Sequence, residues 1–378
     1  MLLTESEQVS NMSTSLTAQT AALKEKNDPI NYINFDDISP LHALEELGLK
    51  INDSDRGYPN FYHLLLVLFA SVLKSSLESV SKSFREAGLD VPSADAVLKN
   101  IAKNTVSKLE RLINRLLFKV FSLAWIRGVP AVVSMDFTDV LYYGKNVEYT
   151  SNTKPRKGTH KAFKFLTVSV VSAVGKFILF AKLVKPGEDI GKLTVQKLKK
   201  IVKIKWLILD KGFYTQSVVY GLKKEGVSFI IAVPKYKSFG KLFKGERSSY
   251  VRYRVAGRFP VWLIRHVDGK GTVYYVSNRK PVDASGVFGY HYRYKRRWRI
   301  EVSFRVIKSF MAFTTSSNPV VRLFFFGFSV IIYNLFIASN FKWLKPEEKA
   351  KLGLPRTGRN FTQWLLKTLI LGIIKIAL

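Results

Sequence analysis

The hydrophobic period of this chain changes near residue 129, and this change constrains the fold more than any other feature. Before it, residues 41–127 have the spacing of helices, and FYHLLLVLFASVL (61–73) is typical of a buried helix. After it, short apolar runs of strand length alternate with helix-length segments. This order predicts a helical region followed by an α/β sheet with helices packed on it.

The sheet region is expected to contain three strands followed by a helix–strand–helix–strand series. Gly175-Lys176 separates the second and third strands and predicts a hairpin. The expected elements are strands at 130–137, 165–174 and 177–184, a helix at 189–203, a strand at 206–213, a helix at 214–225 and a strand at 227–233.

Residues 236–288 interrupt this rhythm. The segments YVRYRV, FPVWLIRHV and GTVYYVSN alternate like half-buried strands, with glycine-containing turns between them. Basic and aromatic residues interleave on them, as on surfaces that hold a phosphate backbone. We interpret this segment as a β-rich insertion; a solvated meander is the alternative.

The apolar run LFFFGFSVIIYNLFIA (323–338) is shorter than the about 20 residues that a spanning helix needs. It is bounded by Arg322 and Lys342 and contains Asn334. We therefore expect a core helix and no membrane partner. The last segment, LLKTLILGIIKIAL, is expected to be a packing or dimer helix in a C-terminal tail, 343–378.

Composition excludes several classes of site. The chain has no cysteine, which excludes disulfides, thiolate zinc sites and Cys–His catalysis. The five histidines are far apart in sequence and show no metal-ligand spacing. Residues 1–40 are expected to be a polar flexible arm, and no signal peptide is evident, so we expect a cytoplasmic protein.

The net charge of +32 is distributed unevenly. Residues 1–128 hold 15 acidic and 14 basic residues, whereas residues 129–378 hold 13 acidic and 46 basic residues. The second part therefore needs a strongly anionic partner, for which a nucleic-acid backbone is the first candidate and a membrane surface the competitor.

The segment 76–100 has the outline of a helix-turn-helix. It contains a helix, a stop at Gly88, Pro92, and a second helix capped by Ser93. The same outline is common in ordinary bundles. We treat DNA contact by this region as an open possibility.

Two acidic residues are expected at the C-terminal ends of strands, where open α/β sheets form their crevice. Asp136 follows the run VPAVVSM, and Asp210 ends WLIL. A carboxylate at the end of a buried strand needs a partner or a metal. Asp139 is a rival for the first position, and a simple turn cap is the alternative for each.

The stretch YRYKRRWRIEVSFRVIKSF (292–310) holds seven basic residues and a single acid, Glu301. On a helix, Tyr294, Arg297, Glu301 and Lys308 fall within one exposed stripe roughly 60° wide. Glu301 is either a salt-bridge partner, of Arg297 for example, or a group that the chemistry requires.

Three motifs in this order resemble the insertion-sequence transposases of the IS-four superfamily. They are SMDFTD around Asp136, LDKGFY around Asp210, and the spacing Tyr-x2-Arg-x3-Glu-x6-Lys that ends at Lys308. The sequence Tyr-Tyr-Gly at 142–144 is similar to the archaeal branch of that family. The resemblance covers about residues 130–340, with departures at Phe137 and Lys211.

The resemblance implies a ribonuclease-H-like mixed sheet with flanking helices, interrupted by a β-rich insertion and preceded by an all-helical region. The expected domains are the arm at 1–40, a helical and possible helix-turn-helix DNA-binding domain at 41–127, the catalytic domain at 128–235 and 289–342, the insertion at 236–288, and the tail at 343–378.

The resemblance also assigns roles to the site residues. Asp136, Asp210 and Glu301 are the expected catalytic and metal-binding acids, and carboxylates without His or Cys suit two Mg²⁺ ions, with Mn²⁺ as a substitute. The expected DNA-binding residues are Tyr294, Arg297, Lys308, Lys211 and Arg305.

We expect a DNA transposase that binds the ends of its element, cuts the strands and joins them to a target. Its expected partners are double-stranded DNA and a second copy, as a homodimer on DNA ends, in the nucleoid of a prokaryotic, archaeal cell. The alternatives are a metal-dependent nuclease of the same fold without strand transfer, and a non-catalytic basic DNA-binding protein.

Overall fold

The structure is a computed structural model of the whole chain. It describes residues 41, 44–45, 48–51, 57–124, 130–171, 176–188, 195–196, 198–245 and 247–342, without the side chains of 123–124, 284, 298–302 and 339–342. The predicted arm, the C-terminal tail, Gly175 of the predicted hairpin, and residues 189–194 and 197 of the helix expected at 189–203 lie outside the described residues.

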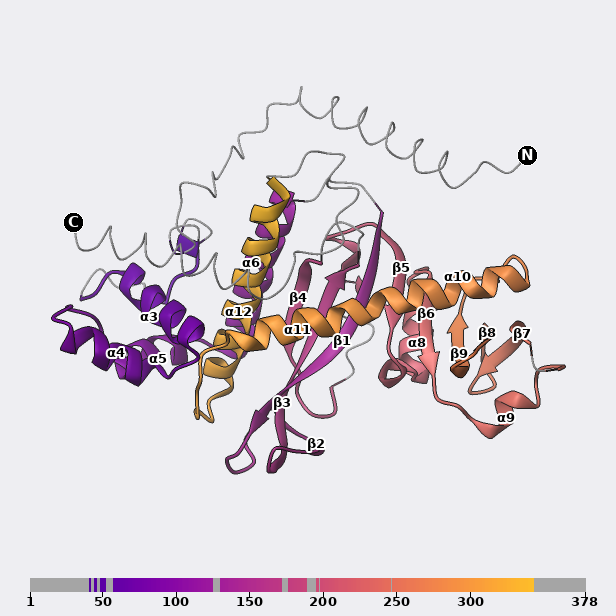
Figure 1. The fold of residues 1–378 in the computed structure, drawn as a ribbon, viewed down its shortest axis with the longest axis horizontal. Coiled ribbons are helices and arrows are strands. Elements are labelled where there is room, and N and C mark those ends of the chain that lie inside the picture. Colours follow the sequence, from indigo (N-terminus) through magenta and orange to yellow (C-terminus); the bar gives the residue numbers. More distant parts are fainter. Residues whose placement is uncertain are drawn as a thin grey trace, which may run out of the picture. The chain divides into compact units, whose positions relative to one another are not determined.

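Within the described residues, nine strands form one mixed sheet (Figure 1). Its order is β2-β3-β1-β5-β6-β9-β8-β7, and β4 pairs with β3. The pairs β1–β5 and β5–β6 are parallel, and the others are antiparallel. The strands are β1 (Ala131–Tyr142), β2 (Thr150–Arg156), β3 (Thr159–Val170), β4 (Ile178–Leu183), β5 (Ile204–Leu209), β6 (Phe229–Val233), β7 (Ser249–Val255), β8 (Phe259–Asp268) and β9 (Gly271–Ser277).

Helices flank this sheet, so the expected mixed α/β sheet with flanking helices is confirmed. The helices are α3 (Asn60–Leu73), α4 (Leu77–Glu86), α5 (Ala94–Ala102), α6 (Val106–Ala124), α8 (Gln216–Lys224), α9 (Lys237–Gly240), α10 (Ala284–Lys295), α11 (Arg299–Ser309) and α12 (Pro319–Lys342), with 3-10 turns η1 (Lys211–Phe213) and η2 (Arg296–Trp298).

The first half of the sheet differs from expectation in strand length. The run expected at 130–137 continues to Tyr142, because Val140 and Tyr142 are buried and pair with the start of β3. β2 was not expected at all. Most of its residues are exposed or half-buried and polar, so no hydrophobic pattern marks it.

The helical region has the predicted outline. α3 is a buried helix, and the Ser76 and Ser93 hydroxyls accept hydrogen bonds from the first turns of α4 and α5. Gly88 ends the first of these helices with φ +80°, a conformation that favours glycine. The helix-turn-helix outline at 76–100 is therefore present as a shape.

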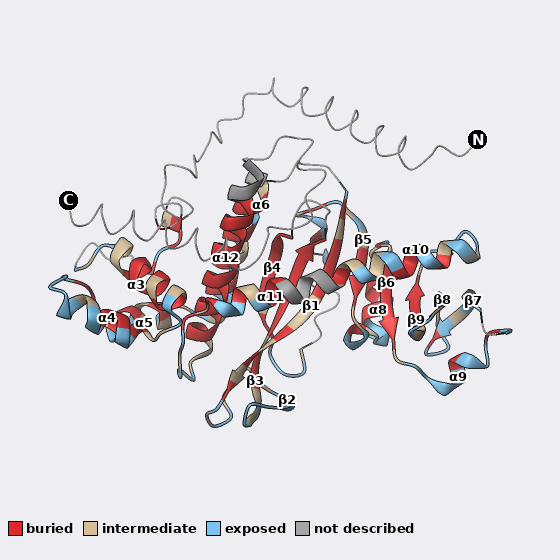
Figure 2. Ribbon diagram, in the orientation of Figure 1, coloured by how far each residue is buried: buried red, intermediate tan, exposed pale blue. Residues whose placement is uncertain are grey.

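α12 is a core helix, as its sequence predicted. Its segment Pro319–Ala338 is long and apolar enough to cross a membrane, but it is completely buried inside the protein (Figure 2). α12 packs against α6 and β4. The Asn334 side chain accepts a bond from the Ile178 N–H at 3.0 Å and donates one to its C=O at 2.8 Å.

A second asparagine, on α6, also hydrogen-bonds the backbone of β4. Asn114 accepts from the Ala181 N–H at 2.8 Å and donates to the Ala181 C=O at 2.9 Å. Because β4 pairs only with β3 in the described sheet, its outer edge would otherwise leave backbone groups unpaired. The pairing of β4 with β3 shifts register between Ile178 and Phe180. Because of this shift, the backbone N–H and C=O groups of both Ile178 and Ala181 can point away from β3.

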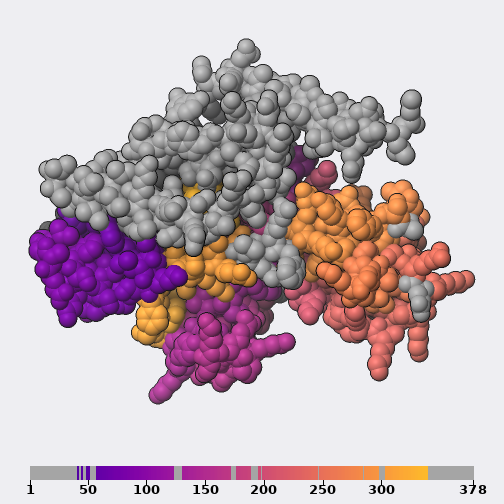
Figure 3. Space-filling view, in the orientation of Figure 1, coloured from indigo at the N-terminus to yellow at the C-terminus, as the bar shows by residue number. Residues whose placement is uncertain are grey.

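β7, β8 and β9 are the strands expected within 236–288, and they extend the same sheet through β6. α10 packs across their face, and the surfaces of these strands and α10 adjoin in Figure 3. Ile230, Ile264, Tyr275, Val287 and Tyr290 form the buried core of this contact, and Tyr294 packs against its border. This packing fixes where the end of α10 meets the sheet.

Candidate active site beside strands β1 and β5

Asp136 and Asp210 lie next to each other at one edge of the parallel strand pair. The last paired residues of β1 and β5 are Met135 and Leu209, so each aspartate is the next residue along its strand. Neighbouring parallel strands lie about 4.8 Å apart, which brings the two carboxylates into one site. The expected convergence of these two acids is present.

The surroundings of the two acids differ. Asp210 follows β5 directly and precedes η1, as the sequence indicated. Asp136 does not end a strand, because β1 continues and Asp136 pairs with Thr167 of β3. The strand on the other side of β1 is β5, and it ends at Leu209, beside Met135. Asp136 therefore lies where β1 continues past the end of its neighbour β5.

The helix expected to carry the four-residue signature is broken. Tyr294 is near the end of α10, Arg297 lies in the 3-10 turn η2, and Lys308 lies in α11. Ideal helical spacing places these residues on one stripe, but the break alters their directions. Phe304 and Ile307 are buried, as expected for the opposite side of α11, and so is Phe310 directly after this helix.

Arg297 joins the two acids. Its Nη1 donates a hydrogen bond to Asp136 Oδ2 at 2.7 Å, and its Nη2 lies 3.8 Å from Asp210 Oδ1. The Arg297 side chain is only 6% exposed, whereas those of Asp136 and Asp210 are 14% and 35% exposed. The expectation of an exposed Arg297 is wrong, because the carboxylates draw its guanidinium into the sheet edge.

Tyr294 completes the contacts around Asp210. Its hydroxyl donates to Asp210 Oδ1 at 3.0 Å, and the Arg297 guanidinium lies 5.5 Å from the centre of its ring. Burial, together with Asp210, raises the pKa of Tyr294. Burial alone would lower the pKa of Arg297, but Tyr294, Asp136 and Asp210 outweigh it and raise this pKa. The phenol and the guanidinium therefore keep their protons.

Lys308 reaches the same strand further along. Its ammonium donates to the backbone oxygen of Asp139 at 2.7 Å. The Asp139 carboxylate is engaged differently: it accepts from Thr153 at 2.9 Å and lies 3.5 Å from Arg156, both on β2. The rival acid thus has partners on the β2 side, whereas Asp136 faces Asp210.

The other predicted site residues occupy three positions. Glu301 lies in the first turn of α11, four residues after Arg297, and its side chain is outside the described residues. Lys211 is exposed at the start of η1, directly after Asp210. Arg305 is exposed on α11.

Phe137, the first departure from the family pattern, has a structural role. Its ring stacks on that of Phe213 in η1, with centroids 4.7 Å apart and an interplanar angle of 4°. Phe137 follows Asp136, and Phe213 ends the turn that begins after Asp210. The stack therefore ties the two acidic segments together, a contact that sequence reasoning did not predict.

The residues at the site fit a divalent cation. Two adjacent carboxylates supply the oxygen ligands that hard cations prefer. Asp136 Oδ1 accepts the Phe137 N–H at 2.8 Å, which leaves Oδ2 directed at the guanidinium. A cationic group is already held by both carboxylates, so the position favours positive charge.

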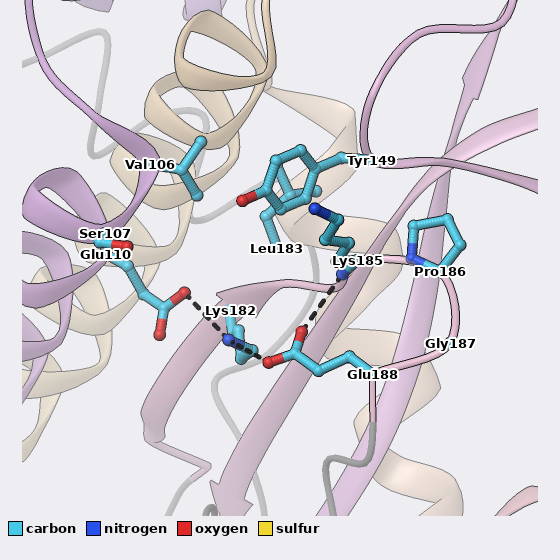
Figure 4. Close-up of a pocket in the computed structure, with 10 residues that line it drawn as sticks. All are labelled: Val106, Ser107, Glu110, Tyr149, Lys182, Leu183, Lys185, Pro186, Gly187 and Glu188. Carbon is cyan, nitrogen blue, oxygen red and sulfur yellow. Dashed lines mark hydrogen bonds and ion pairs between the residues drawn. The ribbon is translucent and has the colours of Figure 1, made fainter.

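A separate surface pocket of about 470 Å³ lies elsewhere on the protein (Figure 4). In it, Lys182 forms ion pairs with Glu188 at 2.8 Å and Glu110 at 3.6 Å. None of the acidic-motif residues lines it. Its fourth charged residue, Lys185, pairs with Glu148 outside the pocket, and we assign the pocket no role in the site.

The chain resembles known proteins in its sequence family and in its fold. The family described as "Transposase DDE domain" matches residues 127–335. No curated protein matches the chain in sequence. Among solved structures, the piggyBac transposase synaptic complex with hairpin DNA has a TM-score of 0.51 at 14% identity, over 87% of this chain and 77% of that chain. This likeness concerns the fold alone.

Two further solved structures are more distant. The Mos1 strand transfer complex has a TM-score of 0.23 at 9% identity, covering 98% of each chain. Endonuclease V from Bacillus subtilis has a TM-score of 0.24 at 11% identity, over 56% of this chain and 86% of that chain. Scores this low support no argument. The family match alone spans more than half of the 378 residues and includes both Asp136 and Asp210. The chain belongs to the transposase DDE domain family.

Proposed function

We propose that this DDE transposase belongs to the archaeal branch of the IS-four superfamily, and that it binds, cuts and transfers the ends of its own element. The observation that carries the proposal is the guanidinium of Arg297, held by Asp136 at 2.7 Å and within 3.8 Å of Asp210. It links the third motif to the first two, although 161 residues separate Arg297 from Asp136.

Asp136, Asp210 and Glu301 are the residues that would hold two Mg²⁺ ions, with Mn²⁺ as a substitute. Such ions activate an attacking water or 3′-hydroxyl and stabilise the leaving oxygen of a phosphodiester. Carboxylates are the appropriate ligands, and Glu301 is the acid of the signature that completes the set. Asp139 does not serve here, because Thr153 and Arg156 engage its carboxylate.

Arg297 has two positions in this proposal. In the free protein it neutralises Asp136 and Asp210, which are close enough to repel each other. With these carboxylates holding cations, the guanidinium would be free to hold a phosphate oxygen of the DNA, which its planar fork suits. Arg297 therefore exchanges a carboxylate partner for a phosphate partner as DNA binds.

Tyr294 and Lys308 position the substrate on either side of Arg297. The Tyr294 hydroxyl orients Asp210 and remains a donor, because burial and Asp210 raise its pKa. Lys308 is exposed beyond its bond to the Asp139 carbonyl, so its ammonium can take a phosphate. Lys211 and Arg305 are both exposed and are the further proposed DNA contacts.

The proposal also covers the fold type, the insertion, the helical region and the oligomeric state. The sheet with acids on β1 and β5 is ribonuclease-H-like, and residues 236–288 are its β-rich insertion. α4 and α5, whose first turns are capped by Ser76 and Ser93, are the candidate helix-turn-helix, and their contact with DNA stays open. The transposase works as a homodimer on two DNA ends in the archaeal nucleoid.

The experiment uses the purified full-length protein with labelled duplexes from the DNA that flanks its own gene, plus a target plasmid and Mg²⁺. The proposal predicts nicks at fixed positions and covalent joining of the cut 3′ ends to the plasmid, both abolished by chelation. Cuts without joined products would favour a nuclease. Binding without either product would favour a non-catalytic DNA-binding protein.

A further inference from the structure

Two histidines that are distant in sequence meet beside an aspartate, in a cluster that does not include Asp136 or Asp210. His266 and Asp268 are on β8, two residues apart and thus on one face of the strand, and His291 is on α10. His266 Nε2 lies 3.6 Å and His291 Nε2 lies 3.8 Å from Asp268 Oδ2. The two imidazole rings stack with centroids 3.8 Å apart and an interplanar angle of 19°.

Both imidazoles are buried and incompletely satisfied. His266 is 4% exposed and His291 is 6% exposed. Within the described residues, His266 Nδ1 and His291 Nε2 have no hydrogen-bond partner. A buried polar atom without a partner is costly, so such atoms call for a bound group. Of these two atoms, His291 Nε2 lies beside Asp268 Oδ2, where His266 Nε2 also lies, so a ligand shared by the three side chains would satisfy it.

The surrounding hydrogen bonds orient the cluster. Asp268 Oδ1 accepts the Lys270 N–H at 2.9 Å, which directs Oδ2 at the histidines. The Tyr275 hydroxyl and His291 Nδ1 lie 2.7 Å apart. If Nδ1 carries the proton and Tyr275 accepts it, Nε2 presents a lone pair, which is the usual arrangement behind a metal-bound histidine. Burial lowers the pKa of both imidazoles, to about 4 for His291, so both are neutral at pH 7.

We propose that His266, Asp268 and His291 bind one divalent transition-metal ion, of which Zn²⁺ is the representative. Their ligand atoms all lie within 4.8 Å of one another. Tetrahedral zinc with bonds of about 2.0–2.1 Å needs ligand atoms about 3.3 Å apart, so contraction by a few tenths of an ångström brings Asp268 to each histidine. The stacked rings must tilt so that both lone pairs meet at one ion.

The chemistry of this site differs from that of the catalytic acids. Imidazole nitrogens select zinc, cobalt, nickel or copper over magnesium, whereas the site at Asp136 offers oxygen ligands. The neighbouring positive charge is Lys295, one helical turn after His291, which lowers the pKa of Asp268 and of both histidines. Lys295 is exposed, so solvent screens its opposition to a cation.

Metal here would fasten α10 to β8 close to the catalytic segment. His291 precedes Tyr294 by one turn, and Tyr275 contacts both: its hydroxyl bonds His291, and its ring centre lies 5.0 Å from that of Tyr294. A filled site would restrict the end of α10, which presents Tyr294 to Asp210. This consequence rests on the proposed function; binding of the ion itself does not.

The test is a titration of metal-free full-length protein with Zn²⁺ by calorimetry and with Co²⁺ by visible absorption. The protein carries Asp136→Asn, Asp210→Asn and Glu301→Gln, so that the catalytic acids do not contribute. We expect one equivalent of bound ion and Co²⁺ bands typical of nitrogen ligands. Asp268→Asn and His291→Gln should each weaken Zn²⁺ binding by at least about tenfold.

Matched variants keep the test decisive. Asp268→Asn retains an oxygen for the Lys270 N–H and sits at a partly exposed position, so its loss of Zn²⁺ binding cannot be attributed to unfolding. Lys295→Ala should bind Zn²⁺ at least as tightly as its parent. No bound equivalent, or equal affinity in the Asp268 and His291 variants, would overturn the proposal. Magnesium-dependent DNA cleavage by otherwise unmodified protein tests the proposed function separately.

Discussion

The guanidinium of Arg297 donates to the carboxylate of Asp136 at 2.7 Å, and both side chains are largely withdrawn from solvent. The same guanidinium lies 3.8 Å from Asp210. An arginine and a divalent ion cannot both occupy this position between the two carboxylates. In the free protein, the residue proposed to hold DNA is therefore the competitor of the proposed metal.

The first prediction concerns this competition. Arg297→Ala should bind Mg²⁺ more tightly in the absence of DNA, by roughly tenfold or about 1.4 kcal/mol, because no cation opposes the ion. Calorimetric titration of the DNA-free protein measures it. The control is Arg305→Ala, which removes an exposed charge from the adjoining helix and should leave Mg²⁺ affinity unchanged. Equal affinity in wild type and Arg297→Ala would show that the ion binds elsewhere.

The second prediction concerns the basic surface. Arg305 is exposed, and if it contacts a phosphate, Arg305→Ala should weaken DNA binding at low salt and reduce the slope of log K against log salt by about one. Fluorescence anisotropy across a salt series gives this slope. Lys82→Ala on α4 tests the helix-turn-helix in the same assay. An unchanged slope for Arg305→Ala would remove this residue from the DNA-binding surface.

The third prediction concerns the edge of β4. Asn334→Leu leaves the Ile178 N–H and C=O unpaired in a buried position, which should lower the free energy of unfolding by about 2–5 kcal/mol. Urea denaturation measures the change. Asn104→Ala is the control, since Asn104 bonds a single carbonyl at a partly exposed helix end. Equal effects of the two substitutions would contradict an edge-pairing role for Asn334.

The sequence was sufficient for the elements whose residues are apolar or capped. The apolar runs predicted β5, β6 and α12. The helix outline with its cap at Ser93 predicted α4 and α5. The sequence did not predict β2, because this segment is a strand through its pairing with β3 and not through burial. Local composition carries no signal for an edge strand of this kind.

The sequence identified most residues of the candidate site but did not predict how they are arranged. Short motifs pointed to Asp136, Asp210 and the segment that follows Tyr294. The burial of Arg297 depends on the charges of two strands far away in sequence, so a helical projection assigned it to an exposed stripe. The cluster at His266 was missed for a similar reason: its second histidine comes from another element, and spacing along the chain does not reveal this.

The fourth prediction concerns pH. His63 is buried in α3, and burial lowers its pKa below the ordinary value of 6.5. The unfolded chain therefore takes up this proton first as the pH falls, so the contribution of neutral His63 to stability is present above about pH 6.5 and is lost below it. His63→Leu should lose less stability than wild type between pH 7 and pH 5 in thermal unfolding. Parallel pH profiles would exclude His63 as a cause.

The claim that Glu301 holds metal and does not merely pair with a base is tested most directly by Glu301→Gln. Cleavage of labelled flanking DNA and binding to it are measured on the same preparation at saturating protein, with Asp139→Asn as the matched control. We predict that Glu301→Gln loses cleavage by at least about 100-fold while binding DNA as well as wild type or better, since a negative charge near phosphates is gone. Asp139→Asn should retain cleavage, because Thr153 and Arg156 hold its side chain outside the acidic pair. Full cleavage by Glu301→Gln together with weakened binding would contradict the account.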